Sequence, residues 1–445
     1  MTTLKIDLTK TGGSIKPMNA VNNGPVGGKT RSNGNFSLYK AAEIPFARNH
    51  DASFCAEYGG EFTVDIHNIF RNFDADENDP GSYIFTVTDE YIKQTAEAGT
   101  ETFYRLGSKI EHGFKFGTHP PKDFAKWARI CEHIIRHYNE GWADGFNYNI
   151  KYWEIWNEPD CQNADGSFPC WQGTEEQFID FYEVAAKHLK KCFPHLNIGG
   201  PAFCSPWRND FKRNFLKAVK ERNIPLDFYS YHCYAKAPIG ICETVIEGES
   251  ALSEYGLDGT FTVLNEWNYI KGWLGDDWRY SLNREKDIKG AAFIAGSMSI
   301  CQNTSLGMLM YYDARPCGMN GLFKAYTFEP LKGYYSFLMF RDLRRLGTHI
   351  PTERFIDDIY SCAATDGKSS AIMLTHFNDD DSTPAKDVKL EISGIKDKAK
   401  IEYYLLDETH DLELVREDVV TSEEFAAYLK MDNFANLLIK VSPLG

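Results

Sequence analysis

The chain has 445 residues, of which 43% are hydrophobic and 14% aromatic, and this composition is typical of a protein with a large buried core rather than of a disordered chain. Its formal net charge of −15 and the lack of a lysine- and arginine-rich stripe argue against nucleic-acid binding. The sequence contains no run of 18 apolar residues, so no membrane-spanning helix is expected.

The amino terminus and the cysteines bear on the cellular compartment. The first residues, MTTLKIDLTKTGG, contain no apolar stretch of signal-peptide length. The 11 cysteines are an odd number and include no C-x-x-C pair, so the sequence does not indicate a disulfide framework. We therefore expect reduced thiols and a cytoplasmic protein.

Between residues 15 and 349, short apolar runs alternate with amphipathic helical stretches, which is typical of strand–helix units around a parallel sheet. The runs with the length and composition of strands are 15–20, 44–48, 102–107, 151–156, 197–200, 227–232, 261–265 and 307–312. Eight strands over about 300 residues predict an α/β fold, the (β/α)8 TIM barrel.

Three helices of this region can be placed from the sequence. Residues 122–139 carry one apolar stripe at i, i+3 and i+4 spacing. Residues 174–192 open with a capping-box pattern, Thr174 with Gln177, and continue with a second apolar stripe. Residues 334–346 are interpreted as the last helix of the barrel.

Residues 350–445 differ in character, because short β runs separated by turn clusters predict an appended antiparallel β-sandwich. A further strand-like run, 4–8, lies in the N-terminal segment 1–14 and is expected to join this sandwich. The acidic stretch 379–381 is interpreted as a solvated turn. A sugar-binding sandwich would need an aromatic platform, for which Tyr403, Tyr404 and Tyr428 are the candidates. A scaffold or oligomer-contact role is favoured.

Two glutamates stand at the ends of predicted strands. Glu158 follows the fourth strand and Glu266 the seventh, each in an apolar and aromatic context with an asparagine directly before it. In a parallel barrel the carboxyl ends of all strands meet on one face, so the two side chains are expected to converge. Cleavage of a glycosidic bond needs such a pair: one carboxyl group protonates the leaving oxygen while the other attacks the anomeric carbon.

Several strand ends taken together resemble those of glycoside hydrolase family 39, a clan A family. The matching elements are Trp-Asn-Glu-Pro at 156–159, Leu-Asn-Glu-Trp at 264–267, Ser-Tyr-His-Cys-Tyr at 230–234, Arg-Asn-His at 48–50, Ile-Gly-Gly-Pro-Ala at 198–202 and Tyr-Tyr-Asp-Ala-Arg at 311–315. The resemblance covers nearly the whole chain. It implies a TIM-barrel enzyme of a family that includes β-xylosidases and α-L-iduronidases and that retains the anomeric configuration.

The resemblance implies roles for the residues around the two carboxyl groups. Glu158 is expected to be the general acid/base and Glu266 the nucleophile. Asn157 is expected to hydrogen-bond the 2-hydroxyl of the sugar, an interaction that strengthens in the transition state. Tyr234 is expected to orient Glu266, and His232 to approach the sugar or the acid/base.

Further substrate-binding residues are expected on the same face. The resemblance implies that Arg48 holds the carboxylate of the nucleophile in its ionised form, while His50 reaches a sugar hydroxyl. Asp313 follows the eighth strand, and the loop residue Trp273 is expected to stack on a sugar ring. His112 follows the third strand, which departs from the xylosidase pattern, and is expected to help rebuild a distal subsite.

Two further residues, Glu154 and Lys236, bear on the structure of the site and on its substrate. Glu154 shares the inward face of the fourth strand with Glu158, and we expect it to be a buried partner of Arg48 or Arg105 rather than a catalyst. The first lysine after His232 is Lys236, whereas the iduronidases of the family carry one closer, and this difference disfavours a uronic-acid substrate.

The predicted function is that of a retaining, exo-acting, β-xylosidase-like glycosidase that removes a terminal sugar from an oligosaccharide or small glycoside by double displacement. Two alternatives stay open: a transglycosidase that uses the same covalent intermediate, and a catalytically inactive carbohydrate-binding barrel. The mechanism needs no cofactor, and the sequence shows no metal-ligand cluster of useful spacing. The resemblance is compatible with a homo-oligomer.

Overall fold

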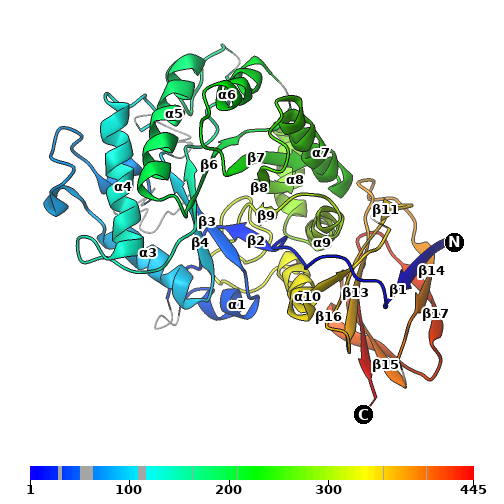
Figure 1. Ribbon diagram of the computed structural model, residues 1–445. Coiled ribbons are helices and arrows are strands. Elements are labelled where there is room, and N and C mark those ends of the chain that lie inside the picture. Colours follow the sequence, from blue (N-terminus) through cyan, green and yellow to red (C-terminus); the bar gives the residue numbers. More distant parts are fainter. Residues whose placement is uncertain are drawn as a thin grey trace.

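The computed structural model describes residues 1–28, 33–50, 64–108, 117–163, 165–207, 209–353, 355–396 and 398–444. It consists of a barrel surrounded by helices and a second, all-β region beside it, to which both chain termini belong (Figure 1). Among the helices of the described residues, none is long and apolar enough to cross a membrane. The ten described cysteines form no disulfide bond with one another.

The barrel is closed and consists of eight parallel strands, which confirms the predicted TIM-barrel fold. In chain order these strands are β2 (Ala20–Asn22), β3 (Phe46–Asn49), β4 (Glu101–Leu106), β5 (Tyr152–Ile155), β6 (Asn197–Phe203), β7 (Phe228–Ala235), β8 (Phe261–Tyr269) and β9 (Met308–Tyr311). Each strand pairs with the next, and β2 pairs with β9 to close the ring.

The first predicted strand, 15–20, is wrong in its position, because β2 begins only at Ala20. The preceding residues are held by side chains and a turn instead of by a strand ladder. The backbone N–H of Lys16 donates to Oε1 of Gln302 at 2.8 Å, and the N–H of Met18 turns back to the carbonyl of Lys16. Pro17 has no N–H to donate, which disfavours a ladder at this point.

The helices of the barrel lie outside the strands, as Figure 1 shows. They are α1 (Phe36–Ala41), α2 (Ile66–Ile69), α3 (Thr86–Glu97), α4 (Phe124–Glu140), α5 (Glu175–Cys192), α6 (Asp210–Glu221), α7 (Pro238–Glu254), α8 (Gly275–Arg284), α9 (Ile288–Gln302) and α10 (Lys332–Leu346), with a short 3-10 turn at Pro80–Ser82. The predicted capping box of α5 is present in full, with the Thr174 and Gln177 side chains each accepting from the other residue's backbone N–H.

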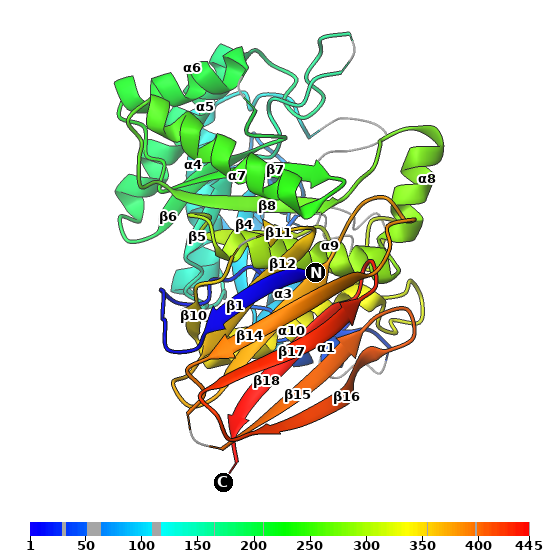
Figure 2. The same cartoon turned by 90° about the vertical axis from the view of Figure 1, so that its right-hand side faces the viewer.

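The second region contains two sheets that pack face to face (Figure 2). The smaller sheet has the order β1 (Thr2–Asp7), β14 (Lys386–Ser393) and β17 (Glu424–Met431). The larger sheet contains β10 (Thr348–Ile350), β12 (Ile359–Thr365), β13 (Ser370–His376), β18 (Asn436–Pro443), β15 (Ala399–Leu406) and β16 (Asp411–Val420), with β11 (Phe355–Ile356) beside β12. The N-terminal strand β1 runs parallel to β14, and the other pairs are antiparallel.

Helix α9 lies between the two regions, since it contacts β8 of the barrel as well as β12 and β13 of the second region, and all of its residues are buried. The acidic stretch predicted as a solvated turn is ordered against this helix. Lys289 of α9 lies 2.8 Å from Asp379 and 3.0 Å from Asp381, and its side chain is fully buried. The Tyr269 hydroxyl at the end of β8 donates to Asp379 at 2.7 Å. The predicted turn is present, with Asp380 and Asp381 exposed, but Asp379 and Asp381 also pair with a buried cation of the barrel region, which the sequence did not indicate.

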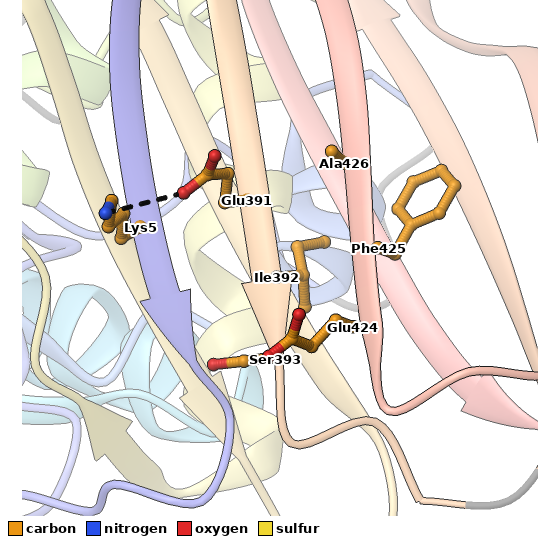
Figure 3. Close-up of a pocket in the computed structure, with 7 residues that line it drawn as sticks. All are labelled: Lys5, Glu391, Ile392, Ser393, Glu424, Phe425 and Ala426. Carbon is orange, nitrogen blue, oxygen red and sulfur yellow. Dashed lines mark ion pairs between the residues drawn. The ribbon is translucent and has the colours of Figure 1, made fainter.

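The smaller sheet carries a surface hollow of about 470 Å³, which Figure 3 shows in close-up. Lys5 and Glu391 form an ion pair of 3.7 Å across its β1–β14 side, and Phe425 is the one aromatic residue in its lining. Of the tyrosines considered as a sugar platform, Tyr403 is buried and Tyr428 is exposed. Because none of these tyrosines lines the hollow and Phe425 is its one aromatic residue, the hollow lacks the aromatic surface on which a sugar ring could stack.

Candidate active site

Glu158 and Glu266 meet at the carboxyl ends of the barrel strands. Glu266 lies within β8, and Glu158 follows β5, where the N–H of Glu158 donates to the carbonyl of Ala202 on β6. The chain curls at this point, with positive φ angles of 77° at Trp156 and 45° at Glu158. A side-chain oxygen of Glu158 and one of Glu266 lie within 4.8 Å of each other. The two glutamates are nearly buried, with 7% and 5% of their surfaces exposed.

Glu266 is surrounded by hydrogen-bond donors. Nη1 of Arg48 donates to Oε1 at 2.8 Å, and Nε2 of His50 lies 3.3 Å from the same oxygen. The Tyr234 hydroxyl donates to Oε2 at 3.0 Å. Donors on both oxygens stabilise the ionised form of a carboxyl group, and they also fix its plane.

Arg48 is fully buried and holds two carboxylates at once. Its Nε donates to Glu154 at 2.6 Å while Nη1 donates to Glu266, and Nη2 donates to Oδ1 of Asn157 at 2.7 Å. Burial alone lowers the pKa of the guanidinium, but the two carboxylates outweigh burial and raise this pKa above its ordinary value. Glu154 is thus the buried partner of Arg48 that the sequence predicted, and the arginine links Glu266 to β5, the strand that Glu158 follows.

The remaining bonds of Glu154 come from two residues that the sequence did not connect with it. The Ser230 hydroxyl and the Asn265 amide both donate to Oε1, at 2.5 and 2.6 Å. Ser230 lies on β7 and Asn265 on β8, and both side chains are fully buried. Both residues stand in strand ends that the resemblance matched, Ser230 at 230–234 and Asn265 at 264–267, but nothing in the sequence indicated that they bind Glu154.

The tautomer of His50 is determined by a second buried arginine. Nε of Arg105 donates to Nδ1 of His50 at 3.2 Å, and Nη2 of Arg105 donates to Asp65 at 2.5 Å. Because an arginine only donates, Nδ1 of His50 is the acceptor and Nε2 carries the proton. His50 therefore presents an N–H to Glu266, and Asp65 compensates the charge of Arg105.

Glu158 has a different environment, because its neighbour is a buried imidazole. Nδ1 of His232 lies 2.7 Å from Oε1 of Glu158 and 3.5 Å from Oε2 of Glu266. Burial lowers the pKa of His232 to about 4, against the opposing effect of the Glu266 carboxylate. His232 is therefore neutral near pH 7. The two catalytic candidates thus differ: Glu266 contacts a guanidinium, whereas Glu158 contacts a neutral ring.

The other predicted substrate-binding residues lie at different distances from this centre. Trp273 is 53% exposed, with its ring edge-on to Tyr234 at a centroid distance of 5.0 Å and stacked on Trp278 at 5.5 Å. Asp313 is buried at the rim between β2 and β9, where Nδ2 of Asn23 donates to it at 3.2 Å. His112 lies outside the described residues.

Donor atoms for a cation come together in three groups within the described part of the chain. These groups are Glu158 with His232 and Glu266, Glu158 with Cys161 and Cys170, and Glu132 with His188 and Cys192. Each combines residues that sequence spacing does not mark as a ligand set. In the first group, the guanidinium of Arg48 already neutralises Glu266, which disfavours a further cation there.

Comparisons with known proteins agree with this geometry. The family model described as "Glycosyl hydrolases family 39" matches residues 33–263. A beta-xylosidase of Geobacillus stearothermophilus is 30% identical over 183 residues, which cover 38% of this chain and 34% of that enzyme. The chain spans about a third of the length of the curated relatives it matches.

Solved structures share the fold over the whole chain. A glucosidase from Croceicoccus marinus superimposes with a TM-score of 0.80 at 20% identity, and the match covers 100% of both chains. A monomeric beta-xylosidase from Caulobacter crescentus gives a TM-score of 0.74 at 16% identity, again over 100% of both chains. The barrel and the second β region therefore occur together in other proteins.

Proposed function

The chain belongs to glycoside hydrolase family 39, and from this premise we propose that it is a retaining, exo-acting glycosidase of the β-xylosidase type. The observation that carries the proposal is the close approach of Glu158 and Glu266, which lie on neighbouring parts of one barrel face with side-chain oxygens within 4.8 Å.

The separation of the two carboxyl groups favours retention. Retaining glycosidases hold their carboxyl groups about 5–5.5 Å apart, so that one of them reaches the anomeric carbon itself. Inverting enzymes need about 6.5–9.5 Å to leave room for a water molecule between carboxylate and sugar. An oxygen-to-oxygen approach within 4.8 Å lies well below the inverting range and supports double displacement.

The surroundings of the two glutamates divide their roles. Glu266 accepts hydrogen bonds from Arg48 and Tyr234, and these donors favour the ionised carboxylate that a nucleophile needs. Glu158 is paired with the neutral ring of His232 and is nearly buried, an environment that favours a protonated carboxyl group. This difference supports Glu158 as the acid and Glu266 as the nucleophile.

In the first step, a carboxylate oxygen of Glu266 attacks the anomeric carbon. The bond from this carbon to the leaving oxygen breaks, and Glu158 transfers its proton to that oxygen. In the second step, Glu158 removes a proton from water while the water oxygen attacks the same carbon. The bond to Glu266 breaks, so the sugar leaves with its original configuration and both glutamates return to their starting states.

Asn157 and Trp273 supply the proposed contacts to the substrate. The amide nitrogen of Asn157 is buried and has no hydrogen-bond partner among the described residues, which suits a donor to the sugar 2-hydroxyl. Trp273 leaves half of its surface exposed next to Tyr234, and such a ring offers a stacking face to a sugar. The xylose type of glycone rests on the relatives named above.

The proposal is tested with a panel of aryl glycosides: β-xyloside, α-L-arabinopyranoside, β-glucoside, β-galactoside and α-L-iduronide. We expect the β-xyloside to be hydrolysed best, and Glu266→Ala to reduce turnover by at least about 1,000-fold. Proton NMR of the first product formed shows retained configuration if the proposal holds. Inverted product, or a Glu266→Ala variant with wild-type activity, would overturn it.

A second variant tests the role of Glu158. In Glu158→Ala, substrates with good leaving groups still form the glycosyl-enzyme because they need no proton, whereas alkyl glycosides do not. Added azide replaces water in the second step and restores turnover of the activated substrate with retained configuration. Product analysis in the same assay separates hydrolysis from transfer to a sugar acceptor, and an inactive binding barrel would show neither reaction.

A further inference from the structure

Two cysteine side chains lie beside the acid/base residue. The sulfur atoms of Cys161 and Cys170 and a carboxylate oxygen of Glu158 all lie within 4.8 Å of one another. Cys170 is buried and Cys161 is half-buried. Two sulfurs and one oxygen therefore converge next to the group that donates the proton in the proposed reaction, and the half-buried cysteine leaves the cluster accessible from solvent.

The loop after β5 holds these donors in place through its own hydrogen bonds. The N–H of Cys161 donates to the carbonyl of Glu158 at 3.1 Å, which closes a turn directly after the acid/base. The indole N–H of Trp156 donates to the carbonyl of Cys170 at 2.7 Å and ties the far end of the loop to the end of β5. Between them, the N–H of Asn163 donates to the carbonyl of Ser167 at 2.8 Å, so the loop returns on itself.

The donor set has a clear chemical preference. Two thiolates with one carboxylate suit a soft or borderline d10 cation such as Zn²⁺ or Cd²⁺, and not Mg²⁺ or Ca²⁺, which prefer oxygen ligands. Around a tetrahedral zinc ion, ligand bonds of about 2.0–2.3 Å place neighbouring donors about 3.5–3.8 Å apart. The three donors need to approach by at most about 1 Å to reach this geometry, which leaves the fourth position for water.

We propose that Glu158, Cys161 and Cys170 form a binding site for a thiophilic divalent cation, and that a cation bound there inhibits the enzyme. On binding, the two thiols and the carboxyl group release their protons to the solvent and donate lone pairs to the metal. Glu158 then has no proton for the leaving oxygen. The inhibition rests on the proposed role of Glu158, whereas the binding itself does not.

The third donor group provides a matched control. Glu132, His188 and Cys192 lie half-buried between α4 and α5, where Nε2 of His188 is 2.7 Å from Glu132, and their donor atoms also lie within 4.8 Å of one another. Glu132 is engaged there by Nε and Nη2 of Arg136 at 3.0 and 2.8 Å, so a cation would compete with a guanidinium. A Cys192→Ser variant removes one thiol of the same protein without changing the loop beside Glu158.

The experiment titrates Cd²⁺ into the full-length protein, kept reduced throughout, in three forms: wild type, Cys161→Ser/Cys170→Ser and Cys192→Ser. The ultraviolet charge-transfer absorption of cadmium–thiolate bonds reports binding, and hydrolysis of the best aryl glycoside reports inhibition. We expect wild type and Cys192→Ser to gain the absorption and to lose at least about 10-fold in activity, reversed by a chelator. The double variant loses this absorption and keeps its own metal-free activity within about 2-fold.

The outcomes separate this inference from the proposed function. Absorption and inhibition that persist in the double variant overturn the site, as does a wild type without thiolate absorption. If the wild type binds Cd²⁺ through these cysteines but hydrolyses no glycoside, the site holds and the proposed function fails. The single variant Cys161→Ser, at a half-buried loop position, provides the same comparison if the double variant does not fold.

Discussion

Nδ1 of His232 lies 2.7 Å from Oε1 of Glu158, so the proposed acid/base has a fully buried imidazole as its immediate neighbour. Burial lowers the pKa of this histidine to about 4. The ring therefore stays neutral above about pH 5, and any ionisation that controls activity between pH 5 and 8 belongs to another group. An imidazolium at this position would also repel Arg48, whose guanidinium binds the neighbouring Glu266.

His232→Ala tests this relationship. We expect kcat/KM for alkyl glycosides to fall by about 100-fold, because Glu158 loses the partner that orients it, and to fall less for glycosides with activated leaving groups. The measurement is a pH profile of kcat/KM for both proteins. A wild-type inflection near pH 6–7 that disappears in the variant would show that the imidazole titrates there, contrary to the buried neutral ring.

Arg48→Lys examines the shared guanidinium. A lysine keeps the positive charge but cannot reach Glu154, Glu266 and Asn157 together, because only a planar fork presents donors in these directions. We expect kcat to fall by at least about 100-fold. Arg48→Met also removes the charge, and the acidic limb of the pH profile should then move to higher pH, since Glu266 loses the cation that favours its ionised form. An unchanged acidic limb in Arg48→Met would contradict this role.

Trp273→Ala tests the rim of the site. The indole is half exposed and contacts Tyr234 edge-on, so its removal should weaken substrate binding more than it slows the chemistry. We expect KM to rise by about 10-fold with kcat changed by less than about 3-fold. Trp207→Ala, at another exposed tryptophan, is the control and should leave both constants near the wild-type values. A larger effect on kcat than on KM would indicate that Trp273 supports Tyr234 instead.

The barrel could be predicted from the sequence because its strands are buried on both faces and therefore read as continuous apolar runs. The run 261–265 corresponds to β8, although the strand continues to Tyr269 through the polar residues Asn265 and Glu266. Apolar composition alone gave no reason to extend it. The run 15–20 was predicted as a strand from its apolar residues, but only its last residue belongs to β2. Apolar residues can be buried at the end of a barrel without forming a β ladder, as the bond from the Lys16 N–H to the Gln302 side chain shows.

The partners of the catalytic candidates were less accessible to sequence analysis. Arg48 bonds to Glu154 and Glu266, which lie 106 and 218 positions further along the chain, and only the closed barrel brings these strand ends together. The aspartates at 379 and 381 have the composition of a surface turn, and nothing local indicates that a buried lysine of α9 faces them. Long-range charge pairing leaves no periodic signal in a single sequence, whereas packing does.

Lys289→Met tests the connection between the two regions. Removal of the buried ammonium breaks its ion pairs with Asp379 and Asp381, although Asp381 keeps Arg284 at 3.2 Å. Because both aspartates are partly exposed, the cost should lie between the roughly 1 kcal/mol of an exposed pair and the about 3–5 kcal/mol of a fully buried one. We expect a lower first transition in calorimetry, with the second β region separating from the barrel. The control is Lys5→Met, which breaks an exposed pair with Glu391 and should change stability by less than about 1 kcal/mol. Equal effects of the two substitutions would show that Lys289 is not a structural anchor.

Glu285, at the end of α8, gives the most specific pH prediction. The residue is fully buried, and neither carboxyl oxygen has a hydrogen-bond partner among the described residues. Burial raises the pKa of Glu285 to about 8, against the opposing charge of Lys286. In the unfolded chain the same group ionises near its ordinary value of 4.5. Between these values the native protein holds one proton more than the unfolded chain.

Stability must therefore fall as the pH rises from about 4.5 to 8, by up to a few kcal/mol from this group. Glu285→Gln removes the ionisation while keeping the shape, so its melting temperature should match that of the wild type at pH 5 and exceed it at pH 8. Glu413→Gln, at an exposed position, should show no such crossover. The measurement is the melting temperature of the three proteins at both pH values. If Glu285→Gln and wild type differ by the same amount at pH 5 and pH 8, Glu285 carries the same charge in the folded and unfolded chains, and the prediction is wrong.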